Sequence, residues 1–385
     1  MNILYIVHDN KKGGAALSFL EMISLISKEH NVYVLVPHKK GFIPEKLKEM
    51  QIPYRNAHYF WWEIELPTNK LMAKLRMTAY KILNLFNEPE AYRIRRKIQS
   101  LNIDIIHSNS SVINFGAYLS KTTGIPHVWH LREYGEGFGL CKVISNDRYK
   151  KIMNDFAVAY IAISKSIKVV FSKIVDEQKI HQIYNGVSSG FNYQKAFVNR
   201  DIHEVKFLIS GNICREKGQI DVIYAINELQ KQGYSNFKVY FAGNGVFEEL
   251  CGITEVYGLE EYVSFCGQVD DMFQLRKETD VEIIASKYEA FGRVTIEAMR
   301  MSNSVIGTNT GGTTELVTEG VNGFFFEYGN YLQLAECMKR YIEDNTLVAE
   351  MGKNAFHSMC GKFTPEENAE NILALYERLY KGNHN

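Results

Sequence analysis

Two glutamates, Glu289 and Glu297, flank the start of an expected helix, and their carboxylates could bind the hydroxyl groups of a ligand. The sequence predicts that this helix begins near Gly292, directly after a strand. Backbone N–H groups of residues 291–294 would then point toward the carboxyl edge of a sheet and bind an anion. Ionised carboxylates accept strong hydrogen bonds from hydroxyls, so the segment fits a nucleotide sugar. The spacing fits a purely structural alternative equally well, in which one glutamate stabilises the helix dipole and the other is exposed to solvent.

A second candidate anion site lies in residues 210–218, which follow an expected strand and precede an expected helix. Arg215 and Lys217 stand in this turn, where their side chains could reach a diphosphate. A surface turn with two solvated cations is the alternative interpretation, and the turn by itself favours it.

Two further features lie where ligands bind in open α/β sheets, at the ends of expected strands. Gly13 and Gly14 join the first strand to the first helix and allow a ligand to approach the backbone closely. They do not form the dinucleotide fingerprint, and residues 243–245 are interpreted as a turn for the same reason. His130 follows the strand-like run 126–129, although a lone histidine is as often structural.

The elements that must position these residues alternate between strands and helices in both halves of the chain, which predicts two doubly wound parallel sheets. The expected strands are 3–7, 32–36, 103–107, 127–131, 159–163, 181–184, 205–210, 238–242, 263–266, 282–285 and 304–307. The expected helices include 15–28, 217–231, 245–251, 271–277, 292–301, 332–344 and a capped helix at 364–381. The polar stretch 190–204 reads as the linker between two similar domains.

Composition supports this organisation. A chain of 385 residues with 46% hydrophobic and 23% charged residues is globular and long enough for two domains. No apolar run reaches the length of a membrane-spanning helix, and the N-terminus does not resemble a signal peptide. The six cysteines are scattered, which fits a reduced cytoplasm and argues against a disulfide framework or a zinc site.

The net charge of zero hides an asymmetry between the two halves. Residues 1–198 carry 27 Lys+Arg against 16 Asp+Glu, and the remainder carries 17 against 28. A basic N-terminal half indicates an anionic partner, such as a phosphorylated acceptor or an acidic membrane face, unless the surface charge has simply drifted.

Much of the positive charge lies in one segment. Residues 59–67 are rich in aromatic side chains, and residues 70–97 hold eight Lys+Arg against two glutamates. A basic amphipathic helix beside tryptophans can lie on an anionic membrane surface. A long helix packed on the sheet, with a solvated basic face and buried aromatics, is the alternative that the sequence favours.

Taken together, these segments resemble the retaining glycosyltransferases of family 4, which have the two-Rossmann GT-B fold with a cleft between the domains and serve in bacterial polysaccharide biosynthesis. The strongest match is an E-x7-E motif with its following glycine loop, and the resemblance is specific in the C-terminal half. The matching segments are Glu289–Gly292, Glu297–Met299, Gly311–Val317, Gly320–Gly323, Val263–Gly267 and Tyr184–Val187.

The resemblance implies roles for the matching positions. Glu297 would hold the ribose hydroxyls, and His130 and Glu289 would act as catalytic residues at the transferred sugar. Lys217 and nearby backbone amides would hold the diphosphate, and the base would lie against residues 267–269. The expected donor site, from the residues and the resemblance together, comprises Gly13, Gly14, Asn212, Arg215, Lys217, Gly267, Gln268, Val269, Phe291, Gly292, Arg293, Val294 and Glu297.

The family further implies retention of the anomeric configuration by front-face attack, with no metal and no cofactor. The donor would be a nucleotide sugar, a UDP-sugar before a GDP-sugar, and cationic side chains would stabilise the leaving diphosphate. The acceptor would be a glycan or a lipid-linked glycan. The enzyme would be cytoplasmic, peripheral at the inner face of the cell membrane through residues 59–97, and would not bind nucleic acid.

The resemblance also defines the expected domains. Residues 1–195 would bind the acceptor, residues 204–363 would bind the donor, and a C-terminal helix within 364–385 would pack back toward the first domain. The two domains would close on the donor through a hinge near 190–204.

The chain departs from the family pattern at two places. Asn212 stands where relatives commonly have arginine, and residues 302–304 replace a Gly-x-Pro turn. A catalytically silent GT-B subunit that stabilises an active partner is therefore a second hypothesis. An NAD-dependent Rossmann enzyme is a third, which the missing fingerprint disfavours.

Overall fold

The chain folds into two compact units. The structure, a computed structural model, describes residues 1–135, 139–188, 190, 193–195 and 203–382. The first unit consists of Met1–Gly186 together with Phe363–Asn385, and the second consists of Val187–Lys362. The chain therefore leaves the first unit once and returns to it for the C-terminal helix.

The division lies earlier in the sequence than the predicted boundary. Residues 187–195, which the sequence assigned to the first domain, belong to the second unit. Lys195 is buried there, and its ammonium group donates to the Asn303 side chain at 2.6 Å and to the Thr279 carbonyl. The sequence analysis interpreted this polar stretch as a linker. The buried ammonium group of Lys195 has hydrogen-bond partners in the second unit, so this part of the stretch is anchored there. Residues 196–202 of that linker lie outside the described residues.

The first unit is built on a parallel sheet with the strand order β3-β2-β1-β5-β6-β8-β9. Its central strands are buried along their whole length, as expected when helices cover both faces of a parallel sheet. The strands are β1 (Asn2–Ile6), β2 (Asn31–Val36), β3 (Tyr54–Asn56), β5 (Ile105–Ser108), β6 (His127–Leu131), β8 (Ala159–Ala162) and β9 (Ile180–Gln182), beside a small antiparallel pair, β4 (Glu63–Ile64) and β7 (Cys141–Lys142).

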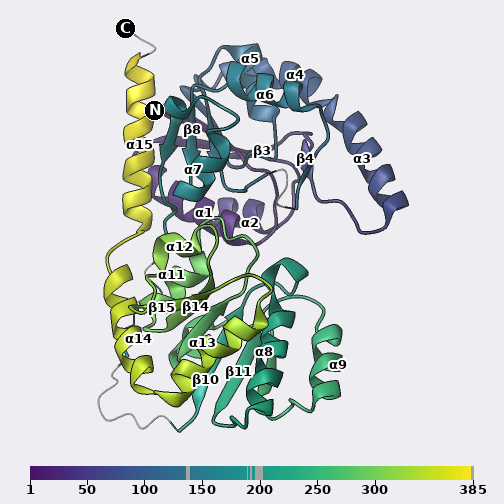
Figure 1. Cartoon of the computed structure of the whole chain (residues 1–385). Coiled ribbons are helices and arrows are strands. Elements are labelled where there is room, and N and C mark those ends of the chain that lie inside the picture. The colour runs from purple at the N-terminus through teal and green to yellow at the C-terminus, as the bar shows by residue number, and fades with distance from the viewer. Residues whose placement is uncertain (136–138, 189, 191–192, 196–202, 383–385) are drawn as a thin grey trace. The chain divides into compact units, whose positions relative to one another are not determined.

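The helices of the first unit come from both ends of the chain (Figure 1). They are α1 (Gly14–Ile26), α2 (Phe42–Glu49), α3 (Lys70–Asn84), α4 (Asn87–Gln99), α5 (Phe115–Thr123), α6 (Asn146–Asp155), α7 (Lys165–Phe171) and α15 (Pro365–Gly382). Helix α15 packs against α1, and its residues Ile372 and Tyr376 enter the same hydrophobic core as Tyr5 and Phe19. The last helix of the chain is thus a structural part of the first unit.

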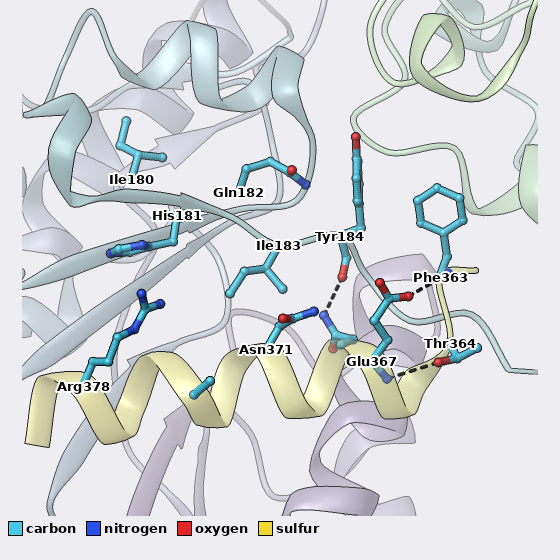
Figure 2. Close-up of a pocket in the computed structure, with 12 residues that line it drawn as sticks. Ile180, His181, Gln182, Ile183, Tyr184, Phe363, Thr364, Glu367, Asn371 and Arg378 are labelled. Carbon is cyan, nitrogen blue, oxygen red and sulfur yellow. Dashed lines mark hydrogen bonds between the residues drawn. The ribbon is translucent and has the colours of Figure 1, made fainter. Parts of the chain in front are cut away.

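The start of α15 is capped as its sequence predicts. The Thr364 hydroxyl accepts a hydrogen bond from the Glu367 amide at 3.1 Å, and the Glu367 carboxylate accepts from the Phe363 amide at 3.2 Å. Figure 2 shows these contacts beside the edge strand β9, where the Asn368 side chain also donates to the Tyr184 carbonyl. The helix is therefore fixed to the first unit at its beginning as well as along its apolar face.

The second unit is built on another parallel sheet, with the order β12-β11-β10-β13-β14-β15. Its strands are β10 (Val205–Ser210), β11 (Phe237–Ala242), β12 (Val263–Gly267), β13 (Val281–Ile284), β14 (Ser304–Thr308) and β15 (Gly323–Phe326). Its helices are α8 (Gln219–Lys231), α9 (Glu248–Tyr257), α10 (Met272–Glu278), α11 (Arg293–Arg300), α12 (Thr313–Leu316), α13 (Tyr331–Glu343) and α14 (Thr346–Met359). The prediction of two parallel α/β sheets is confirmed.

The basic segment differs from the predicted single helix. Helices α3 and α4 are separated at residues 85–86, where the buried amides of Asn84 and Asn87 both bond to Asn114. Trp62 is fully buried and donates its indole N–H to the Ser111 carbonyl at 2.6 Å, which agrees with the favoured alternative of buried aromatics. Such internal bonds satisfy polar groups that a surface helix would leave to water.

Helix α3 extends away from the sheet of the first unit (Figure 1). Its residues Leu71, Leu75 and Ile82 are 67%, 57% and 54% exposed. Within the described residues, no helix is long and apolar enough to cross a membrane.

Candidate functional site

Two predicted site residues that are distant in sequence form an ion pair in the second unit. The Lys217 ammonium lies 3.0 Å from the Glu289 carboxylate, and Glu289 raises the pKa of Lys217. The loops that carry them follow the neighbouring strands β10 and β13 and pack closely together. A Cβ at Gly218 would lie only 2.3 Å from the Ala285 carbonyl oxygen, so this approach requires glycine.

The loop before helix α11 is held by a second glycine contact. The Gly312 amide donates to the Glu289 carbonyl at 2.6 Å, and a Cβ at Gly312 would lie 2.4 Å from the Phe291 carbonyl oxygen. Gly292 precedes α11 with φ of 99°, a conformation that favours glycine. The predicted helix start is confirmed, and the glycines after β14 fix the loop that leads into it.

Glu297 lies on α11 and is 9% exposed. One of its carboxylate oxygens accepts from the Arg276 guanidinium at 2.9 Å, and the other accepts from Arg293 at 2.9 Å. Each oxygen has two lone pairs, so each keeps the capacity for one further hydrogen bond. The carboxylate is thus oriented on both sides and can still accept from two ligand hydroxyls.

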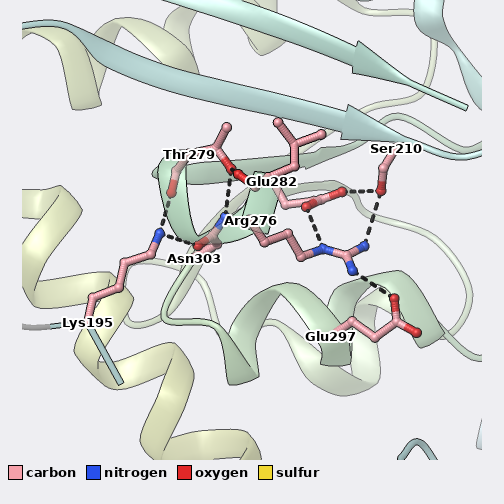
Figure 3. A network of polar contacts seen from close by, with 8 residues as sticks. Lys195, Ser210, Arg276, Thr279, Glu282, Glu297 and Asn303 are labelled. Atoms are coloured by element: carbon pink, nitrogen blue, oxygen red, sulfur yellow. Dashed lines mark hydrogen bonds and ion pairs between the residues drawn. The ribbon is translucent and has the colours of Figure 1, made fainter. Parts of the chain in front are cut away.

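Arg276 extends this arrangement into the core (Figure 3). Its guanidinium is fully buried and also donates to Glu282 and to the Ser210 hydroxyl, each at 3.2 Å. Burial lowers the pKa of Arg276, but the carboxylates of Glu282 and Glu297 outweigh it and the pKa is raised overall. Burial raises the pKa of Glu282. We call Arg276, Ser210, Glu282 and Glu297 the Arg276 network.

The sequence analysis missed Arg276 and Glu282. The available signal was a glutamate inside the otherwise apolar strand β13, at a position where a parallel sheet is buried on both faces. Such a carboxylate needs a buried cation, and α10 immediately before the strand supplies one.

The other predicted donor residues surround the same sheet edge. Gly267 ends the edge strand β12 and residues 268–269 follow it, and the Gly267 carbonyl accepts from the Gly243 amide at 2.7 Å. Gly243 also approaches Gly211 so closely that a Cβ would lie 1.7 Å from its carbonyl oxygen, which accounts for the turn at 243–245. Asn212 and Arg215 are exposed in the loop after β10.

The remaining predicted residues lie in the first unit. Gly13 precedes α1 and Gly14 begins it; both are exposed, and a Cβ on either would meet no described atom within 4 Å. His130 lies on β6 and is fully buried. Its Nδ1 is 3.1 Å from Nε2 of His107, and burial lowers the pKa of both rings well below the usual value.

Other features contribute nothing to this set of residues. The recess in Figure 2, about 500 Å³ between β9 and α15, contains none of the predicted site residues in its lining. In the part of the chain that the structure describes, there is no group of three or more His, Cys, Asp or Glu that could hold a metal ion.

Comparison with known families assigns both halves of the chain. The model described as Glycosyltransferase Family 4 matches residues 12–190, and the model described as Glycosyl transferases group 1 matches residues 193–358. This protein is a GT-B glycosyltransferase.

Individual relatives of the glycosyltransferase are distant. It is 27% identical over 246 residues to the capsular polysaccharide biosynthesis glycosyltransferase CapM of Staphylococcus aureus, a match that covers 60% of this chain and 64% of CapM. It is 28% identical over 295 residues to an uncharacterized glycosyltransferase of Methanocaldococcus jannaschii, covering 75% of this chain and 80% of the relative.

Among solved structures, the glycosyltransferase resembles HepE of Anabaena in complex with UDP, with a TM-score of 0.79 and 22% identity over 98% of this chain and 100% of HepE. HepE has also been solved with UDP-glucose. At this identity the likeness establishes the GT-B fold. The group 1 match contains Lys217, Glu289 and Glu297, and the family 4 match contains His130.

Proposed function

We propose that this glycosyltransferase transfers a sugar from a nucleotide-sugar donor to a hydroxyl group of a glycan or lipid-linked glycan, with retention of the anomeric configuration. The observation that carries the proposal is the joint placement of Lys217, Glu289 and the oriented Glu297 at one sheet edge. These groups complement a diphosphate that has sugar hydroxyls at both ends. The neighbour HepE, which binds UDP and UDP-glucose, favours a UDP-sugar, with a GDP-sugar next.

Each group in the second unit has a distinct part in the proposal. Glu297 accepts from the ribose hydroxyls through its two remaining lone-pair positions, while Glu289 accepts from hydroxyls of the transferred sugar. Lys217 and the amides at the start of α11 bind the diphosphate and stabilise it as it leaves. Arg215, exposed in the same loop, supplies the charge that is missing at Asn212, where relatives commonly have arginine. The proposal requires no metal.

Donor binding provides the first test. A thermal-shift panel of UDP, GDP, dTDP and ADP with their common sugars should show stabilisation by one nucleotide class, since a ligand that binds only the folded state raises its stability. The shift is expected to persist in EDTA. Loss of the shift in EDTA would contradict metal-free binding, and no shift with any nucleotide would favour the silent subunit.

The role of Glu297 has a sharper test. Glu297→Ala should weaken donor binding by roughly 1–3 kcal/mol, because it removes hydrogen bonds to a charged group. Titration calorimetry with the stabilising nucleotide measures this loss, and Glu350→Ala on α14 is the matched control, since it removes an exposed glutamate of the same unit. Unchanged affinity in Glu297→Ala would contradict the ribose assignment.

Turnover distinguishes an enzyme from a silent subunit. Glu289→Gln should lower kcat by a larger factor than donor affinity, because the transferred sugar is the group that changes in the transition state. Turnover is measured as nucleotide release in the presence of an alkyl glycoside acceptor. Proton NMR of the glycoside formed then reports its anomeric configuration, and an inverted product would contradict the retaining mechanism.

The same proposal places the enzyme in the cytoplasm, at the inner face of the cell membrane. The six free cysteines fit a reducing compartment. Helix α3 supplies the membrane contact, because Leu71, Leu75 and Ile82 share one exposed face at 100° per residue. Lysines flank this face, and α3 has no acidic residue.

An anionic lipid surface fits this face better than a second copy of the chain. A copy would bring a second set of four cations against the first, whereas anionic headgroups attract them and the acyl region accepts the leucines. A recess of about 450 Å³ lined mainly by apolar atoms, including Phe60, Leu83 and Phe86, continues the apolar face toward α4.

Vesicle sedimentation tests the membrane contact. The protein should sediment with phosphatidylglycerol vesicles, less with phosphatidylcholine vesicles, and less in high salt. Leu75→Ser/Ile82→Ser should abolish sedimentation, while Val256→Ser, which removes an 81% exposed apolar side chain from α9, should not. Concentration-dependent dimerisation that the double variant abolishes, without vesicle binding by the native protein, would contradict the proposal.

A further inference from the structure

Three buried side chains of the first unit form a continuous line of polar contacts that ends at His130. The Tyr376 hydroxyl of α15 lies 2.6 Å from Nδ1 of His107 on β5. Nε2 of His107 lies 3.1 Å from Nδ1 of His130 on β6. All three residues are fully buried. Nε2 of His130 is buried and has no hydrogen-bond partner among the residues that the structure describes.

Each neutral imidazole has one N–H, so the line has only two consistent directions. In one direction Tyr376 donates to His107, His107 donates to His130, and His130 carries its proton on Nε2. In the other direction His130 donates to His107, His107 donates to the Tyr376 hydroxyl, and that hydroxyl donates to Tyr5, so Nε2 of His130 carries a lone pair.

Arg132 selects between the two directions. Its guanidinium lies 3.4 Å from Nδ1 of His130 and is held in place by Asn109 and Asn185, whose side-chain oxygens accept at 3.0 Å and 2.7 Å. A guanidinium has donors and no acceptor, so at this long distance it favours, without by itself fixing, a lone pair on the nitrogen that faces it. The fixed positive charge therefore favours His130 with its proton on Nε2.

Burial keeps the line neutral. It is the main cause that lowers the pKa of His107 and of His130, and the charge of Arg132 adds to it. Protonation of either ring would place a second positive charge beside Arg132 in the core. The line therefore fixes a tautomer and carries no net charge.

We infer that Tyr376 and His107 are positioning residues that hold His130 as its Nε2–H tautomer, so that His130 acts as a hydrogen-bond donor and not as a general base. The catalytic meaning of this inference rests on the proposed function: the Nε2–H would donate to an oxygen of the transferred sugar. The C-terminal helix thereby acquires a role in the reaction through two intermediate residues.

His127 provides an internal reference on the same strand. Its Nδ1 lies 3.1 Å from the Phe156 carbonyl, which can only accept, so Nδ1 carries the proton. Its Nε2 lies 2.9 Å from the Ser108 hydroxyl, which then donates. The two histidines of β6 are therefore expected to be opposite tautomers.

Nitrogen-15 NMR of the free protein labelled at histidine tests the tautomer directly. His130 should show a proton-bearing Nε2 and a bare Nδ1, and His127 should show the reverse. The His130 signals are assigned by their loss in His130→Gln. A proton-bearing Nδ1 of His130 in the native protein would overturn the inference, whatever the donor or acceptor.

Tyr376→Phe tests the positioning role. The phenylalanine keeps the ring in the core but removes the donor to His107, so His130 should show a mixture of both tautomers. In the proposed reaction kcat should fall roughly tenfold, the effect of losing one hydrogen bond in the transition state, with little change in donor KM.

Tyr5→Phe is the matched control, since it removes only the competing acceptor: the Tyr5 hydroxyl accepts from Tyr376 at 3.3 Å, whereas Nδ1 of His107 lies at 2.6 Å and remains. It should leave the His130 tautomer and kcat unchanged. A single Nε2–H tautomer retained in Tyr376→Phe would overturn the role of Tyr376. A tautomer mixture with unchanged kcat would support the positioning and contradict instead the proposed contact of His130 with the sugar.

Discussion

The two units orient a side chain at a sheet edge by different chemistry. In the second unit, Glu297 is held by ionic contacts with Arg276, which a buried Glu282 holds in turn. In the first unit, His130 is held by neutral hydrogen bonds from His107, which Tyr376 orients. Both arrangements bring together residues that are distant in sequence, and both are buried.

The difference predicts which kind of change destabilises each unit. Removing one member of a buried ionic network leaves an uncompensated charge in the core, which is far more costly than one lost neutral hydrogen bond. Neutral histidines have another weakness, because unfolding lets them take up protons in mild acid. The stability of the second unit should therefore be sensitive to truncation of a side chain in the ionic network, and the stability of the first unit should be sensitive to pH.

Truncation of Arg276 should have the largest effect. Arg276→Met leaves Glu282 buried without its cation, and we expect a loss of about 3–5 kcal/mol in the unfolding free energy of the second unit. Urea denaturation followed by hydrogen exchange of β10 and β13 measures this loss. The double variant Arg276→Met/Glu282→Gln should recover part of it, and a loss in Arg276→Met below about 1 kcal/mol would contradict the ionic account.

Acidification should have the next largest effect, a loss of stability in the first unit. Burial lowers the pKa of His107 and His130 well below 6.5, and that of His127 to about 3. Below pH 6.5 the unfolded chain binds protons that the folded unit does not, so stability is lost as the pH falls from 6.5 toward these folded-state values. Three such groups would lower the stability of the first unit by about 4 kcal/mol between pH 7 and 5.5.

The second unit should respond in the opposite sense through its network. Burial raises the pKa of Glu282, so the folded state holds that proton more tightly than the unfolded state, and stability rises as the pH falls through the folded-state pKa toward 4.5. Hydrogen exchange at pH 7 and 5.5, corrected for intrinsic rates, should show protection lost in β5 and β6 before β10 and β13. Equal loss in both sheets would remove the distinction.

Two serine substitutions give the smallest and most closely matched comparison. Ser210→Ala removes a donor to the charged Glu282, and Ser108→Ala removes a donor to the neutral His127. Because hydrogen bonds to charged groups are the stronger ones, we expect losses of about 2 kcal/mol and about 1 kcal/mol in the respective units. Thermal unfolding of both variants in parallel measures the difference, and a larger loss in Ser108→Ala would reverse the comparison.

Much of the fold could be read from local patterns. The expected strands 127–131 and 205–210 are reproduced as β6 and β10, because apolar runs bounded by turns report burial on both faces of a sheet. Strand β15 was not predicted: only its first residue, Gly323, was assigned, to the end of a glycine loop, and pairing with β14 reveals the strand. The break between α3 and α4 was missed because its cause is a bond from Asn87 to Asn114.

The candidate site was likewise only partly predictable from the sequence. The E-x7-E spacing, the glycine turns and Lys217 were visible as residue types at fixed intervals, and these determined the family and the fold class. Arg276, His107 and Tyr376 were not singled out, because nothing in their immediate neighbours marks them. Glu282 had one local signal, its place in an otherwise apolar strand, and that signal was missed.

Sequence alone thus determined what depends on neighbouring residues: alternating elements, helix caps and a family motif. Tertiary structure decided what depends on residues that meet only after folding: which carboxylate is paired, which imidazole nitrogen carries a proton, and which apolar helix face stays exposed. The physical reason is that pairing, burial and tautomer are set by the side chains packed around a group, and those come from many parts of the chain.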